Sequence, residues 1–152
     1  MTSLKETAMS ADLPKTNAPG GDYVSVIVHG GVAYVSGQLP RRGDELVVKG
    51  KVGAEVDLAA AQRAAAVCAE LCLAALAESL GGLDRIEQIL RITGYVASAP
   101  GFVQQSQVMN GASEVLVAHL GRRGRHTRTS VGVAELPRGA PVEIDLIAAV
   151  RT

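Results

Sequence analysis

Residues 57–82 read DLAAAQRAAAVCAELCLAALAESLGG, and they predict the element around which the fold is built. Asp57 is a residue type that caps helix N-termini, and Gly81-Gly82 stops the run. Alanine, the residue with the highest helix propensity, fills much of the interval. Its small side chain lets a helix lie close on a sheet. The stretch therefore predicts a core helix over residues 58–80, and Arg63, Glu70 and Glu78 argue against a membrane span.

The segments around this helix show the alternation and β-branched residues that are typical of strands. Before the helix, we predict strands at Val24–His29 and Val32–Ser36 joined by the Gly30-Gly31 hairpin, then a turn at Arg41–Asp44 and a short strand at Leu46–Val48. After it, we predict a strand at Ile86–Val96 and a second helix at Gly101–Leu120, with Pro100 in its first turn. The last two predicted strands are Thr129–Leu136 and Val142–Val150. This order predicts an α/β domain with one sheet and both helices on the same face of it. We expect the other face to be apolar and covered by another copy, which predicts a homo-oligomer.

The composition narrows the classes of function. Lys+Arg and Asp+Glu number 15 each, so the formal net charge is +0 and nothing attracts the chain to nucleic acid or to an anionic membrane. Aromatic residues make up 3%, too few for a platform that stacks bases. Cys68 and Cys72 are interpreted as buried thiols in a reducing compartment, and the three histidines lack zinc-site spacing. Without a signal-peptide pattern, we expect a cytoplasmic protein. Residues 1–18 are expected to form a flexible segment, and residues 19–152 a single domain.

Arg128 is the foremost candidate for a functional residue. The segment Arg122–Arg128 holds four arginines and His126, and we interpret its first three arginines as a solvated basic loop. Arg128 differs because it directly precedes a predicted strand, whose rigid backbone would hold the planar guanidinium. Such a fork binds a carboxylate through two hydrogen bonds, worth roughly 1.5–3 kcal/mol when sheltered from water.

Two further pairs of residues give weaker indications of a functional site than Arg128 does. Glu143 and Asp145 fall on one face of their predicted strand, which is most simply a solvated surface. A glutamate in a partly apolar cleft can instead orient or activate water. Ser36 and Gly37 offer a hydroxyl and a backbone N–H that a ligand can approach closely.

Three segments, taken together, resemble the reactive-intermediate deaminase (RidA/YjgF) family. They are YVSGQLP at residues 34–40, the helical run after Asp57, and RTSVGVAELP at residues 128–137 followed by Val142-Glu143-Ile144. The resemblance spans residues 19–151, and the paired signatures in this order are specific to the family, although each alone is not.

The resemblance implies an α/β (α+β), chorismate-mutase-like fold in which two helices pack on one face of a mixed sheet. It also implies a homotrimer with clefts between subunits that bind small carboxylates without a metal or other cofactor. Better-known members hydrolyse enamine and imine intermediates, such as 2-aminoacrylate and 2-iminopropionate, to 2-oxo acids and ammonia. By position, Arg128 matches the arginine that grips the substrate carboxylate, and Glu143 the glutamate that positions the attacking water. The residues that match the cleft are Tyr23, Ser36, Gly37, Asn110 and Ser130.

The chain also departs from the family pattern, which indicates a divergent subgroup. Ser130 stands where many members carry a cysteine. The loop at residues 121–127 reads GRRGRHT, where better-known members have a proline two residues before the arginine. Gly94-Tyr95 and Asn110-Gly111 differ as well.

The last two predicted strands bear on how Arg128 and Glu143 could meet. Their short connection should leave them antiparallel, with Arg128 and Glu143 each near the start of its strand. About seven residues of strand, or roughly 23 Å at ~3.3 Å per residue, would then separate them. One subunit could not place both on one small ligand, so a shared site requires Arg128 of one chain and Glu143 of the next.

Three alternatives remain open on the residues alone. The same cleft could bind or sense a small carboxylate without turnover. RNA cleavage is attached to some relatives, although the zero net charge and the scarcity of aromatic residues weigh against it. The third is a chaperone-like or scaffolding trimer.

Overall fold

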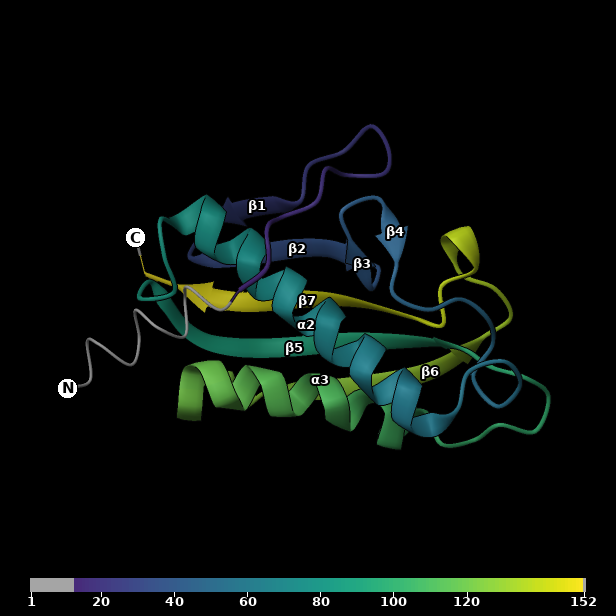
Figure 1. Cartoon of the computed structure of the whole chain (residues 1–152). Coiled ribbons are helices and arrows are strands. Elements are labelled where there is room, and N and C mark those ends of the chain that lie inside the picture. Colours follow the sequence, from purple (N-terminus) through teal and green to yellow (C-terminus); the bar gives the residue numbers. More distant parts are fainter. Residues whose placement is uncertain (1–12, 152) are drawn as a thin grey trace.

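The computed structural model describes residues 13–151. Its elements are β1 (Val26–His29), β2 (Val32–Gln38), β3 (Arg41–Arg42), β4 (Glu45–Leu46), α2 (Leu58–Leu80), β5 (Ile86–Ala97), α3 (Gln105–Leu120), the 3-10 turn η1 (Gly121–Gly124), β6 (Thr127–Val133), the 3-10 turn η2 (Pro137–Gly139) and β7 (Val142–Val150). Five strands form one mixed sheet in the order β1-β2-β7-β5-β6, in which β5 and β6 are parallel and the other neighbours antiparallel. Both helices cover the same face of this sheet (Figure 1), which confirms the predicted architecture.

The long helix α2 forms for the local reasons that its sequence indicates. The carboxylate of Asp57 accepts a hydrogen bond from the Ala60 amide at 2.8 Å, and Gly81 ends the helix in the left-handed region at φ 79°. Length and composition would let α2 cross a membrane, but 61% of its most apolar window is buried within the domain. It is the core helix that the sequence predicts.

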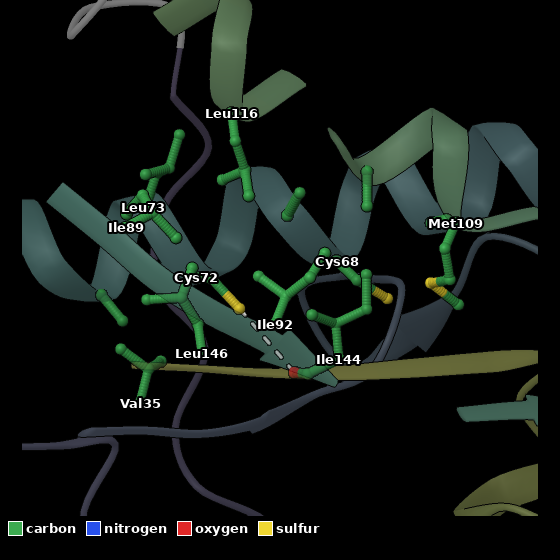
Figure 2. Close-up of a cluster of buried hydrophobic side chains, with 14 of the residues drawn as sticks. Val35, Cys68, Cys72, Leu73, Ile89, Ile92, Met109, Leu116, Ile144 and Leu146 are labelled. Atoms are coloured by element: carbon green, nitrogen blue, oxygen red, sulfur yellow. Dashed lines mark hydrogen bonds between the residues drawn. The ribbon is translucent and has the colours of Figure 1, made fainter. Parts of the chain in front are cut away.

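The core lies between the two helices and the sheet. Cys68 and Cys72 are fully buried against Val35 and Leu146 of the sheet, and the Cys72 thiol donates to the Ile144 carbonyl at 3.7 Å (Figure 2). Burial raises the pKa of both thiols, so they stay protonated. These cysteines act as small hydrophobic side chains, as predicted.

The first hairpin follows the predicted pattern with shifted bounds. Gly30 and Gly31 both have positive φ, at 60° and 76°, which the two-residue turn requires. β1 starts at residue 26 rather than 24, and β2 continues to residue 38 rather than 36. The sequence predicts a turn at residues 41–44 and a short strand at residues 46–48. In the structure, residues 41–46 instead form the small hairpin of β3 and β4.

Two predicted elements were wrong at their starts. The second helix begins at Gln105 and not at Gly101, because Gly101 takes a left-handed φ of 86° in the preceding turn. Strand β6 spans Thr127–Val133 and not Thr129–Leu136, because its pairing with β5 begins at Thr127, opposite Arg91, and ends at Val133, opposite Ala97. Arg128 therefore lies inside the strand, and not before it.

The prediction of a flexible segment at residues 1–18 falls mostly on residues 1–12, which lie outside the described part of the chain. In the described remainder of that segment, Leu13 packs against the core cluster. Arg41 also donates to the Ala18 carbonyl at 3.0 Å.

Candidate active site

β5 separates the strands that carry Arg128 and Glu143, and this corrects the predicted distance between the two residues. Arg128 pairs with Ile92 of β5 and Glu143 with Tyr95. The offset from residue 92 to residue 95 is three residues, or roughly 10 Å along the strands at ~3.3 Å per residue. The prediction of seven residues was wrong because it did not place β5 between the two strands.

The two residues nevertheless point to opposite faces of the sheet. Ile92 is buried beneath the helices, and Arg128, its partner in register, lies on the same side. Tyr95 comes three residues later on β5, so it and Glu143 point to the face that no described helix covers. Within residues 13–151, one chain therefore forms two half-sites.

The first half-site is the guanidinium of Arg128, which α3 holds. Nη1 donates to Asn110 Oδ1 and to Ser113 Oγ, both at 3.0 Å. Nη2 donates to the Ser106 carbonyl at 3.2 Å and to Ser106 Oγ at 2.9 Å. Strand β6 and helix α3 thus fix the position of the positive charge together.

Asn110 and Ser130 complete this half-site. Asn110 Oδ1 accepts a hydrogen bond from Arg128, while its role in binding a ligand stays a prediction. Ser130 shares the helix-facing side of β6 with Arg128, and its hydroxyl is shut off from solvent without a hydrogen-bond partner in the described chain. Its register partner Gly94 leaves the space that Met109 fills, because a Cβ at Gly94 would overlap the Met109 sulfur.

The second half-site surrounds Glu143 on the uncovered face. Gly37 makes room for the carboxylate, because a Cβ at this glycine would overlap Glu143 Oε2. Asp145 lies two residues along the same strand and accepts a hydrogen bond from the Tyr95 hydroxyl at 2.9 Å. Burial, and then the negative charge of Asp145, raise the pKa of Glu143 above its usual value. Such a carboxyl holds and releases a proton nearer to neutral pH than an exposed one does.

Ser36 lies on β2, and Tyr23 lies in the loop before β1. The Ser36 hydroxyl donates to the Ser25 carbonyl at 3.3 Å, so part of its capacity is used within the strand pair. Tyr23 is 51% exposed in the loop before β1, and its hydroxyl accepts from the Gly20 amide at 3.3 Å. The structure therefore places Arg128, Asn110 and Ser130 on the helix-covered face and Glu143 and Gly37 on the other. Within residues 13–151, the Ser36 and Tyr23 hydroxyls form hydrogen bonds with neither group.

Sequence reasoning missed three partners of the arginine half-site. Ser106 and Ser113 contact the guanidinium, and His126 contacts Ser113. With Asn110 the two serines follow the spacing i, i+4, i+7, a polar stripe on one helix face that could have been found in the sequence. No group of metal-ligating side chains occurs within residues 13–151.

The chain belongs to the class of small two-layer α/β proteins, with a helix-held arginine on one sheet face and a glutamate on the other. Similarity to known proteins identifies its family. A model of the family described as endoribonuclease L-PSP matches residues 15–150. Protein TCP17 of Trypanosoma cruzi is 40% identical over 136 residues, which are 89% of this chain and 85% of that protein. The chain therefore belongs to the endoribonuclease L-PSP family, also called the YjgF/RidA family.

Solved structures agree with this assignment. The protein Atu1372, of unknown function, from Agrobacterium tumefaciens superimposes with a TM-score of 0.88 at 40% identity, covering 99% of this chain and 100% of that chain. RidA from an Antarctic Psychrobacter species superimposes with a TM-score of 0.62 at 28% identity, covering 90% of this chain and 94% of that chain. The resemblance to the RidA/YjgF family that the sequence motifs indicated is thus confirmed.

Proposed function

We propose that this chain hydrolyses reactive enamine and imine intermediates, of the 2-aminoacrylate and 2-iminopropionate type, to 2-oxo acids and ammonia. The reaction would take place in a cleft between the subunits of a homotrimer. An enamine first tautomerises to its imine as a proton moves from nitrogen to the β-carbon. Water then adds to the carbon of the C=N bond, and the resulting carbinolamine expels ammonia as the carbonyl forms. No step needs a metal or an organic cofactor.

The observation that carries the proposal is the fixed guanidinium of Arg128. It stands on a strand within the sheet, and three residues of α3 hold it. A positive charge held in this way binds a substrate carboxylate at one place and so orients the adjacent reactive carbon. Because imines hydrolyse readily in water, orientation alone would contribute much of the acceleration.

In this proposal, Glu143 transfers the protons. Its raised pKa suits a group that takes a proton from water and returns it to the leaving nitrogen. Because Glu143 points to the opposite face from Arg128, a ligand that contacts both needs Arg128 of one subunit and Glu143 of another. The trimer that the family resemblance implies would provide this arrangement.

Ammonia release from freshly generated 2-iminopropionate tests the proposal. We expect Arg128→Ala to lower the rate at least tenfold, because it removes a charge-assisted contact worth about 1.5–3 kcal/mol. Arg122→Ala is the matched control, since Arg122 is exposed in η1 and should leave the rate unchanged. Equal rates for the parent and Arg128→Ala would exclude the proposed enzyme. Saturable binding of 2-oxobutanoate without ammonia release would favour a carboxylate-binding protein instead.

A further inference from the structure

The guanidinium of Arg128 has an inner and an outer side. Its Nη1 donates to the half-buried Ser113 and to Asn110, whereas its Nη2 donates to both the hydroxyl and the carbonyl of Ser106, which is exposed at the start of α3. The Nε atom has no hydrogen-bond partner within residues 13–151, and it is not among the buried polar atoms left unpaired there. The edge formed by Nε and Nη2 is therefore the one that a ligand can approach.

On its inner side, Arg128 is linked to the backbone of Gly124 through Ser113 and His126. The His126 ring lies with Nε2 at 2.8 Å from Ser113 Oγ and Nδ1 at 2.6 Å from the Gly124 carbonyl. Gly124 is buried and packs closely on α3, because a Cβ there would overlap the Leu116 carbonyl. The chain of contacts runs from Gly124 through His126 and Ser113 to Arg128.

The direction of each hydrogen bond in this chain follows from chemistry. A carbonyl oxygen only accepts, so His126 Nδ1 carries the proton and donates it to Gly124. In the neutral ring Nε2 then accepts, and the Ser113 hydroxyl must donate to it. The Ser113 oxygen keeps a lone pair for the Arg128 Nη1–H. Every member is satisfied in a single arrangement, which favours one conformation of the guanidinium.

We propose that Ser113 and His126 are positioning residues that hold Arg128 from its inner side, while a ligand carboxylate docks at Nε and Nη2 and replaces Ser106. This inference rests on the proposed role of Arg128 in carboxylate binding. It adds that the Ser113 and Ser106 contacts, although both are serine hydroxyls on α3, have opposite effects on affinity. Ser113 preorganises the site, and Ser106 competes with the ligand.

Calorimetric titration of the full chain with 2-oxobutanoate tests the opposite signs. We expect Ser113→Ala to weaken binding about tenfold, since it removes a hydrogen bond to a charged group. Ser113→Thr keeps the hydroxyl and should retain most of the affinity. Ser106→Ala should bind as tightly as the parent or tighter. Glu114→Ala, exposed beside Ser113 on the same helix, is the control.

Variants of His126 separate positioning from general structural damage. Glutamine can place an acceptor near the Nε2 position, so His126→Gln should retain more affinity than His126→Phe. Both should raise KM for 2-iminopropionate more than they lower kcat. Thermal melts show whether each variant is folded.

The parent protein offers a readout that needs no substitution. We expect ¹⁵N NMR at mildly alkaline pH, where imidazoles are neutral, to find the proton of His126 on Nδ1. The exposed His29 serves as the internal reference for a ring in solvent. A proton on Nε2 of His126 would contradict the proposed chain of hydrogen bonds.

The outcomes distinguish the two proposals. If Arg128→Ala binds 2-oxobutanoate as well as the parent does, the proposed role of Arg128 fails. If Arg128→Ala abolishes binding but Ser113→Ala leaves it unchanged, only the positioning role fails. An equal loss in Ser106→Ala and Ser113→Ala would also overturn the assignment of an inner and an outer side.

Discussion

At the scale of single residues, the environment of Glu143 has the clearest chemical consequence. The carboxylate is half-buried, fits into space left by Gly37, and lies beside Asp145. Burial and like charge both disfavour its ionised form, which a solvated surface carboxylate would not experience. The protein therefore maintains a carboxyl group whose charge is unfavourable to folding, a pattern common at functional sites.

Glu143→Gln tests this cost through the dependence of stability on pH. A carboxyl whose pKa is higher in the folded state binds more protons there, so the stability that it contributes falls as pH rises above the unfolded value near 4.5. We expect the glutamine variant to lack this decline and to be more stable at pH 7 by a fraction of ~1 kcal/mol, since solvent screens a half-buried group. Urea unfolding of both proteins at several pH values measures the difference. An identical pH profile for parent and variant would contradict the raised pKa.

Gly37→Ala tests the space beside the same carboxylate. The added methyl group would meet Glu143 Oε2, the mobile end of a side chain, so the carboxylate should move at a stability cost below about 1 kcal/mol. We expect the rate of ammonia release from 2-iminopropionate to fall strongly, although the free energy of unfolding changes little. In a Glu143→Ala background, the same substitution should have little further effect on either quantity. Independent, additive losses in the double variant would show that Gly37 acts by another route.

At the scale of elements, the contact between α2 and α3 supports the arginine half-site. Gly111 allows the helices to approach closely, because a Cβ there would overlap the Gln62 carbonyl of α2. Asn110 and Ser113, which hold Arg128, flank this crossing point. The glycine that departs from the family pattern in the sequence thus has a packing role in the structure.

Gly111→Ala should destabilise the domain although alanine is the better helix former. The substitution gains about 1 kcal/mol in helix propensity. It also forces two backbones apart, and such overpacking typically costs about 1–3 kcal/mol or more. We expect a net loss by urea unfolding, together with weaker binding of 2-oxobutanoate. Glu114→Ala on the exposed side of α3 should stay within about 0.5 kcal/mol of the parent, and a stabilised Gly111→Ala would contradict the close crossing.

The elements themselves were largely predictable from local patterns. The cap at Asp57, the stop at Gly81 and the Gly30-Gly31 turn specify α2 and the first hairpin through interactions close in sequence. The starts of α3 and β6 were not predictable in the same way. The α3 start depends on the left-handed turn at Gly101, and the bounds of β6 depend on its pairing with β5.

At the scale of the whole molecule, the sheet face that no described helix covers exposes large apolar side chains. Ile27, Tyr34 and Ile147 form a row of register partners across β1, β2 and β7, and the first two are 55% and 49% exposed. The face was predicted to be apolar, but Glu143, Asp145 and Tyr95 give its other part a polar character. A second copy that covers this face would both bury the apolar row and approach Glu143.

Mixing two inactive variants tests whether subunits share a site. Arg128→Ala and Glu143→Ala chains, unfolded together and refolded, should regain activity, because some interfaces then pair an intact Arg128 with an intact Glu143. For random assembly of a cyclic trimer, about a quarter of the sites would be restored. Each variant refolded alone should stay inactive. No recovery in trimers shown by sedimentation to be mixed, or a monomer at micromolar concentration, would contradict the shared cleft.

Local sequence patterns were enough to predict the core helix, the alternation of strands and helices, and the motif residues that identify the family. Those features arise from helix caps, side-chain periodicity and turn glycines, which act over a few residues. Three features became visible only in the folded chain. Strand β5 lies between β6 and β7, and Arg128 and Glu143 face opposite ways. Ser106 and Ser113 contact the arginine, and His126 contacts Ser113. The reason is physical: strand order and register depend on how distant segments bury their apolar faces together, and no local pattern specifies that choice.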